Sequence, residues 1–315
     1  VNENYLSKEP GRGTFVNNFN NSNKSRKKTG NIFFLRSCHN RKGSEHEQYN
    51  SKVCDDIFYP QVIAGIDMVA EEKNYHCIFK YIYEEDIDNK LIKEIQEKAD
   101  GIICGELHSQ KMLDTITKIN IPVVLVSPSV INNKIDIIDI DNFNGAYNLI
   151  DHLIKMGHRE IALIGAVESN RPAIQRKNGF LEALSNKNIH FDKSLYFNNG
   201  WKFEDGYQAA EKILKLQDKP TAVFAVSDLL AIGAINCFKD NGYNVPDDIS
   251  VVGFDDIDMA KQIRPTLTTM KVRKVDMGKE AADLIFNKID GKQRNYSIRI
   301  TVPTEFMKRN SVKEL

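Results

Sequence analysis

Short apolar runs alternate with amphipathic stretches along most of the chain. The clearest case is an apolar run at 222–226, then apolar residues at helical spacing over 228–240, then a second apolar run at 249–254. A short apolar run between turn residues predicts a buried strand, and apolar residues three or four apart predict a helix with one buried face. The order predicts a βαβ unit with parallel strands and a right-handed crossover.

Polar residues follow both strands of this unit. Ser227 and Asp228 come directly after the first strand, and Asp255 and Asp256 end the second. Ligands of open parallel sheets bind beyond the carboxyl ends of the strands, so Ser227, Asp228 and Asp255 are candidate ligand contacts. Asp228 also suits the N-cap of the following helix, and this structural interpretation is the favoured one. Asp256 is expected to be structural.

The same alternation covers residues 31 to 302 and predicts an α/β protein with two doubly wound parallel-sheet lobes. We expect lobe 1 at 31–140, completed by about 262–315, and lobe 2 at 141–261. Further strands are predicted at 31–36, 77–81, 101–104, 122–126, 136–140, 161–165 and 299–302, and helices at 61–73, 88–98, 109–119, 204–216 and 274–289, with another between Asp141 and Gly157.

The first 30 residues do not form a complete domain. Residues 11–16 (GRGTFV) predict a tight glycine turn that leads into a short strand, the second half of a hairpin. Residues 17–30 are rich in Asn, Ser and Lys, which predicts a flexible, solvated linker. The chain does not begin with Met, so we expect a processed or cut form.

Composition narrows the function classes. The chain has 315 residues, enough for two domains, and its 43 Lys and Arg balance its 43 Asp and Glu, so the net charge gives no indication of nucleic-acid binding. No apolar run is long enough to span a membrane, and no signal-peptide pattern is present. The five cysteines are scattered, without a CxxC pair, which favours a reducing, cytoplasmic compartment.

Catalytic and metal motifs are lacking. The sequence has no GxSxG, P-loop or HExxH pattern, and no GxGxxG opens a helix, so we do not expect an enzyme or a cofactor. Cys38, His39, His46 and Cys54 match no common zinc spacing, and a surface loop is the expected structure there. Strand-end acids that hold Mg²⁺ in a phosphatase are a minor alternative.

The side-chain chemistry suits a sugar. Trp201 is the single Trp and lies in a polar loop. The apolar face of a sugar ring packs on aromatic rings, and its hydroxyls bind carboxylates and guanidinium groups. Trp201, Phe58, Arg176, Asp255 and Ser227 supply this set. The structural alternatives are that Trp201 covers the edge of a core and that Phe58 and Tyr59 pack at a helix start.

Several segments between about residues 30 and 310 closely resemble the effector-binding core of the LacI/GalR family. The resemblance implies two lobes of the periplasmic-binding-protein type I, a sugar in the cleft and a homodimer. By motif it implies that Phe58, Tyr59, Asp141, Arg176, Trp201, Ser227 and Asp255 face the ligand. The segments are DNFNGAYNLIDHLIKMGHREIALIG, RKNGF, PTAVFAVSDLLAIGA, NVPDDISVVGFDDID, RPTLTTM, MGKEAADLI and PTEFMKRNS.

Residues 7–16 (SKEPGRGTFV) resemble the wing of the winged helix-turn-helix domain in GntR-type regulators. By this resemblance residues 1–16 are the remnant of a DNA-binding domain, with Arg12, Gly13 and Thr14 near operator DNA. Its pairing with a LacI/GalR core resembles the arabinose repressors of Gram-positive bacteria, which implies L-arabinose or a similar pentose as effector. The alternatives are a transport-type sugar-binding protein, or a regulator that senses a purine or a sugar phosphate.

Overall fold

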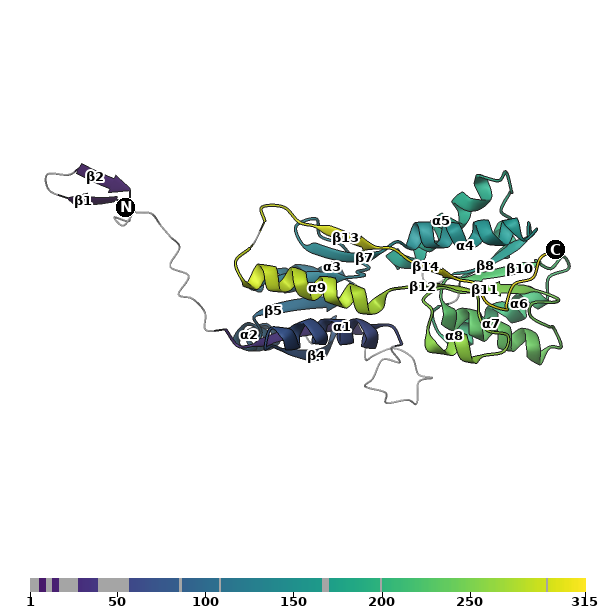
Figure 1. Ribbon diagram of the computed structural model, residues 1–315, viewed down its shortest axis with the longest axis horizontal. Coiled ribbons are helices and arrows are strands. Elements are labelled where there is room, and N and C mark those ends of the chain that lie inside the picture. Colours follow the sequence, from purple (N-terminus) through teal and green to yellow (C-terminus); the bar gives the residue numbers. More distant parts are fainter. Residues whose placement is uncertain are drawn as a thin grey trace.

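The computed structural model describes residues 6–9, 13–16, 28–38, 57–84, 87–107, 109–165, 170–198, 200–292 and 294–315. Two α/β lobes lie end to end along the long axis of the molecule (Figure 1). Each lobe has a parallel sheet between layers of helices, as the alternation of apolar runs and amphipathic stretches predicts.

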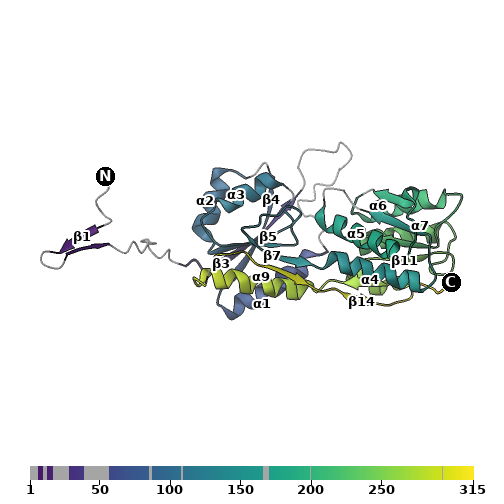
Figure 2. The same cartoon turned by 90° about the horizontal axis from the view of Figure 1, so that it is seen from above.

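Lobe 1 contains a six-stranded parallel sheet in the order β13-β7-β6-β5-β3-β4. Helices α1 and α9 cover one face, and α2 and α3 cover the other (Figure 2). The strands are β3 (Asn31–Cys38), β4 (His76–Tyr83), β5 (Gly101–Gly105), β6 (Val123–Val126), β7 (Asp136–Ile140) and β13 (Arg299–Val302). The helices are α1 (Tyr59–Glu72), α2 (Asn89–Lys98), α3 (Gln110–Thr117) and α9 (Lys274–Ile289).

Lobe 2 contains a four-stranded parallel sheet in the order β11-β10-β8-β9. Helices α4 and α5 lie on one side of this sheet and α6 and α7 on the other (Figure 1). The strands are β8 (Ile161–Gly165), β9 (Tyr196–Asn198), β10 (Ala222–Ala225) and β11 (Ser250–Val252). The helices are α4 (Asn142–Lys155), α5 (Arg171–Ser185), the 3₁₀ helix η3 (Lys193–Leu195), α6 (Phe203–Leu214), α7 (Asp228–Asp240) and α8 (Asp258–Gln262).

In the part of the chain that the structure describes, there are three crossings between the lobes: from β7 to α4, from β12 (Thr269–Lys271) to α9, and from β13 to β14 (Glu305–Met307). β12 and β14 pair antiparallel at the junction. Within residues 262–315, α9 and β13 pack in lobe 1, whereas the two ends of the segment bond to lobe 2. There the Gly253 amide donates to the Thr268 carbonyl at 3.1 Å and the Val251 amide to the Ser311 carbonyl at 2.8 Å.

The predicted strands and helices of both lobes are confirmed, and the bounds of α9 and β13 match the sequence prediction. Helix α5 falls in a stretch that is largely polar and basic, and its buried face includes Arg176 and Gly179, which weakens the apolar pattern of the helix. Strands β12 and β14 have three residues each, too few to show a periodicity. Across the described residues, no helix has the length and apolarity needed to cross a membrane.

Near the start of the chain, β1 (Leu6–Glu9) pairs antiparallel with β2 (Gly13–Val16). The predicted short strand at the end of GRGTFV is therefore present. Arg12, the predicted linker up to residue 27 and residues 39–56 lie outside the described residues. The assignment of β1 and β2 to a DNA-binding wing stays a prediction.

Candidate effector-binding site

A cleft of about 200 Å³ lies between the lobes. Both sides of its wall come from residues at or just beyond the carboxyl ends of strands and from helix starts, where ligands of parallel α/β sheets bind. Six of the eight predicted effector residues line it: Phe58 and Tyr59 from lobe 1, and Arg176, Trp201, Ser227 and Asp255 from lobe 2.

Arg176 is a buried side chain of the cleft wall that is held by three hydrogen bonds. It is 3% exposed, and its Nε, Nη1 and Nη2 donate to Asn142 Oδ1 at 2.8 Å, the Val226 carbonyl at 2.6 Å and Asp255 Oδ1 at 3.0 Å. Its guanidinium carbon lies 3.8 Å from the centre of the Phe254 ring. These contacts fix Arg176 and orient Asp255, whose carboxylate retains lone pairs for a ligand.

The backbone that carries Asp255 is in an uncommon conformation. Asp255 and the next residue, Asp256, have φ values of +116° and +50°, a region that non-glycine residues rarely adopt and that clusters at ligand sites. Three contacts hold it: Lys274 Nζ donates to the Asp255 carbonyl at 2.5 Å, the Asp255 amide donates to Met270 at 2.8 Å, and Arg309 Nη2 donates to Asp256 Oδ1 at 2.5 Å. Burial lowers the pKa of Lys274, whereas the nearby Asp255, Asp228 and Asp256 favour its charged form.

Trp201 and Ser227 each combine a structural and a binding position. Ser227 is the N-cap of α7 and accepts from the Leu230 amide at 3.4 Å, yet it also lines the cleft. Trp201 lines the cleft and packs against the hydrophobic core beside α6. The structural and ligand-binding interpretations of these two residues are therefore compatible.

Asp228 does not line the cleft. It is fully buried, and its Oδ1 and Oδ2 accept from Thr269 Oγ1 at 2.5 Å and the Ile257 amide at 2.9 Å. Burial, followed by the charge of Asp255, raises its pKa to about 7. Contrary to the favoured sequence prediction, Asp228 is also not the N-cap of α7, because Ser227 occupies that position.

Asp141 is also not among the lining residues. Its Oδ1 caps α4 by accepting from the Asn144 amide at 3.2 Å, and both carboxylate oxygens accept from Asn144 Nδ2, at 3.0 and 2.9 Å. Asp141 and Asp228 make bonds within the protein and do not line the cleft, and their direct contact with a ligand stays a prediction.

An ion pair on the lobe 1 side was not predicted. Arg36 Nε and Nη2 donate to Glu106 Oε2 at 3.1 and 2.8 Å, and the Arg36 guanidinium carbon lies 5.0 Å from the centre of the Tyr59 ring. Arg36 lies near the end of β3 and Glu106 follows β5, so the strand-end rule that identified Asp255 also applies to them. Ser127, Ser129 and Asn170 are further polar residues of the wall.

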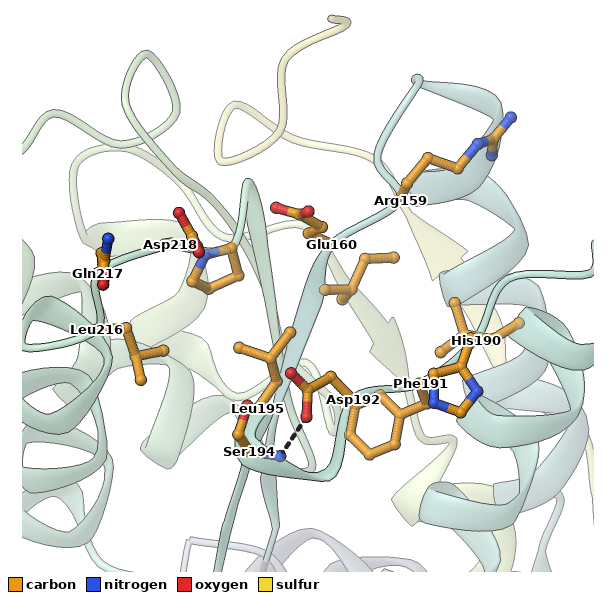
Figure 3. A pocket seen from close by; sticks show the side chains of 13 residues that line it. Arg159, Glu160, His190, Phe191, Asp192, Ser194, Leu195, Leu216, Gln217 and Asp218 are labelled. Carbon is orange, nitrogen blue, oxygen red and sulfur yellow. Dashed lines mark hydrogen bonds between the residues drawn. The ribbon is translucent and has the colours of Figure 1, made fainter.

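A second hollow, of about 440 Å³, lies at the opposite, amino-terminal edge of the lobe 2 sheet (Figure 3). Its wall includes Arg159, Phe191 and Pro220, and Asp192 there accepts from the Ser194 amide at 2.8 Å. None of the predicted effector residues line it. Although it is larger, this hollow lies away from the edge where the strand ends converge.

Known proteins resemble this chain in both sequence and fold. A family model for the periplasmic binding protein-like domain matches residues 150–312. The NTD biosynthesis operon regulator NtdR of Bacillus subtilis is 32% identical over 260 residues, which cover 82% of this chain and 79% of that protein. The HTH-type transcriptional repressor PurR of Mannheimia succiniciproducens is 31% identical over 265 residues, covering 82% of this chain and 78% of that protein.

Among solved structures, the complex of the transcriptional regulator CelR with cellobiose is 26% identical and has a TM-score of 0.79, covering 90% of this chain and 85% of that one. A LacI transcriptional regulator from Bacillus cereus subsp. cytotoxis is 27% identical with a TM-score of 0.79, over 90% of this chain and 99% of that one. The chain belongs to the LacI family of transcriptional repressors. The named relatives are transcriptional regulators, and the CelR structure is a complex with cellobiose.

Proposed function

We propose that this chain is the effector-sensing core of a cytoplasmic LacI-family repressor, and that its effector is a neutral sugar bound between the lobes. The observation that carries the proposal is the composition of the cleft wall. Phe58 and Trp201 face the cleft from opposite lobes, and Asp255 and Ser227 lie beside them. Aromatic faces pack on the apolar side of a sugar ring, and carboxylate and hydroxyl groups bind its hydroxyls.

The charge of the wall favours a neutral ligand. Among the described residues, Glu106 and Asp255 are the carboxylates that line the cleft, and each is paired with a lining guanidinium, Arg36 at 2.8 Å and Arg176 at 3.0 Å. A phosphate or uronate would need guanidinium or ammonium groups whose hydrogen bonds are directed at the ligand. Because these pairs neutralise one another, hydroxyl groups suit the wall better than an anion.

The size of the cleft favours a compact ligand. Its volume of about 200 Å³ is below the roughly 300–1,000 Å³ of pockets for drug-sized ligands. The similar CelR structure is a complex with cellobiose, which supports a saccharide as the class of ligand. We favour L-arabinose or a similar pentose, because the GntR-type wing resemblance points to that group of repressors.

The sugar would regulate DNA binding through the angle between the lobes. A ligand that contacts both lobes favours the angle at which both contacts form, and only such a difference in affinity shifts the equilibrium. In a homodimer this angle would set the spacing of two DNA-binding heads, of which Arg12, Gly13 and Thr14 would form part of the wing. A coupling of about 1–3 kcal/mol is usual for such systems.

Two rivals differ in class or in ligand. A transport-type sugar-binding protein would share the fold, but the matched relatives named above are regulators. A purine sensor would use the same aromatic pair, since Phe58 and Trp201 also suit a planar ring. A sugar phosphate fits least well with the neutralised wall.

A thermal-shift screen tests the proposal. At one hundred times its dissociation constant, a ligand stabilises the native state by about 2.7 kcal/mol, which corresponds to a rise in Tm of about 5 °C or more. We expect L-arabinose or another neutral pentose to produce this rise, and purines and sugar phosphates to produce none. A rise with purines or sugar phosphates alone would transfer the proposal to those ligands, and no rise with any neutral sugar would refute it.

A further inference from the structure

We propose that Arg171 and Asp139 form a positioning pair that holds the two lobes at the effector-binding angle. The inference rests on the proposed function, because the pair would hold the lobes at the angle at which the effector binds. Neither residue lines the cleft, so the pair acts through geometry and not through contact with the ligand.

The pair joins the two lobes directly. Arg171 is the first residue of α5 in lobe 2, and Asp139 lies on β7 in lobe 1, two residues before Asp141, where the chain first crosses. Arg171 Nη2 donates to Asp139 Oδ2 at 2.6 Å, a short, charge-assisted bond. Because one partner belongs to each lobe, a change in the lobe angle must stretch or break this bond.

The pair is poorly suited to a purely stabilising role. The Asp139 side chain is 3% exposed and that of Arg171 19%, so both charges give up much of their hydration. Buried ion pairs often contribute little net stability for this reason, although removal of one partner is costly. Arg171 also places a cation at the amino end of a helix, where the helix dipole disfavours it, and among the described residues its buried Nη1 has no hydrogen-bond partner.

The neighbours of the pair place it at the edge of the cleft. Ile140, which follows Asp139, lines the cleft, as do Asn170 and Pro172 on either side of Arg171. Asn170 Nδ2 also reaches across the junction to Ser129 Oγ at 3.5 Å, and its Oδ1 caps α5 through the Ala173 amide at 3.0 Å. The position of the start of α5, and with it the lobe 2 wall, is therefore tied to lobe 1 at this point.

The pair affects the apparent affinity for the effector through the fraction of molecules that adopt the binding-competent lobe angle. Only the angle that brings both walls to the ligand is competent to bind, and the apparent dissociation constant is the intrinsic constant divided by the competent fraction. The pair favours the competent angle, so its loss weakens effector binding while every ligand contact remains in place.

Three variants separate this role from a merely structural one. Asp139→Asn and Arg171→Gln each break the pair, and Arg171→Gln leaves a buried, unpaired carboxylate that lowers the Tm. The double variant Asp139→Asn/Arg171→Gln removes both charges and should recover most of the lost Tm. We expect all three to bind the neutral pentose identified by the screen about tenfold more weakly in calorimetry, within the roughly 5- to 150-fold range of allosteric coupling.

Small-angle X-ray scattering of the unliganded chain supplies the readout of the lobe angle. We expect the double variant to give a larger radius of gyration than the wild-type chain. The matched control is Lys155→Gln, which breaks an ion pair of the same 2.6 Å length that lies within α4, and which should change neither affinity nor scattering.

The inference would be overturned if the double variant had the effector affinity and the radius of gyration of the wild-type chain. It would also be overturned if the loss of affinity in the three variants were proportional to their loss of Tm. A wild-type chain that binds no neutral sugar would instead refute the proposed function. In that case the scattering comparison alone decides whether Arg171 and Asp139 set the lobe angle.

Discussion

Asp228 is a fully buried carboxylate next to the loop that carries Asp255. Its amide donates to the Phe254 carbonyl at 2.7 Å, and its side chain accepts from the Ile257 amide and the Thr269 hydroxyl. These bonds connect the start of α7 to the loop that follows β11 and to β12, the strand at the junction of the lobes. Asp228 therefore supports the shape of the site from behind the wall.

The raised pKa of Asp228 predicts a pH dependence of stability. Its folded-state pKa of about 7 lies above the ordinary value of 3.8, so the folded state holds a proton that the unfolded state has lost. The resulting stabilisation is full below about pH 4 and is lost as the pH rises through about 7. Asp228→Asn keeps a polar side chain beside the Ile257 amide and the Thr269 hydroxyl but removes the titrating group. The fall in the free energy of unfolding between pH 5 and 8, measured by urea denaturation, should therefore be smaller in this variant. Parallel curves for the variant and the wild type would contradict this.

At the residue scale, the rule that ligands bind beyond the carboxyl ends of parallel strands selected Asp255, which lines the cleft, but also two acids that do not line it. Asp255 and Ser227 follow apolar runs that the sequence shows clearly, and both line the cleft. Asp228 and Asp141 satisfy the same rule, but their carboxylates are used by amides and hydroxyls of the protein. The pattern places a residue at the correct edge of a sheet, but the direction of its side chain depends on tertiary contacts.

At the scale of elements, the helix layers of both lobes pack through glycines. In lobe 1, a Cβ at Gly65 of α1 would overlap the Val275 carbonyl oxygen, and one at Gly278 of α9 would overlap that of Val62. In lobe 2, Gly206 of α6 and Gly233 of α7 approach the facing helix in the same way. The close approach buries the apolar faces that the amphipathic pattern predicts, because backbone meets backbone at the crossing.

Gly278→Ala tests this packing. The added methyl group has no space against the Val62 carbonyl, so α1 and α9 must separate, and overpacking of this kind costs typically about 1–3 kcal/mol. Urea denaturation should show this loss, whereas Lys279→Ala, at an exposed position of the same helix, should change the stability by less than about 0.5 kcal/mol. Equal stability of the two variants would show that the helix pair can relax without cost.

The sequence predicts the elements best where they are long. Helix α9, with 16 residues, shows a complete apolar face, and its predicted bounds are those observed. Helix α8, with five residues, is too short to show a periodicity, and the three-residue strands of the junction are defined by pairing between distant segments.

At the scale of the whole molecule, the alternation of strands and helices and the family resemblance both predict the two-lobed arrangement, but neither predicts the contacts proposed to fix the lobe angle. Asp139 and Arg171 are separated by 32 residues, and nothing in either segment marks them as partners. The return of the C-terminal segment to lobe 2 was also unexpected, with the Leu315 amide donating to the Met156 carbonyl at 2.8 Å. These are long-range contacts, which periodicity and local motifs do not encode.

The central claim, that a neutral sugar binds between the lobes, is tested most directly by the fluorescence of Trp201. It is the single Trp of the chain and it lines the cleft, so its emission reports occupancy of that site alone. Titration with the stabilising pentose should give a saturable change in emission, shifted to at least tenfold higher concentration in Asp255→Asn. Binding heat without any change in Trp201 emission, or an unaltered titration curve in Asp255→Asn, would contradict the account.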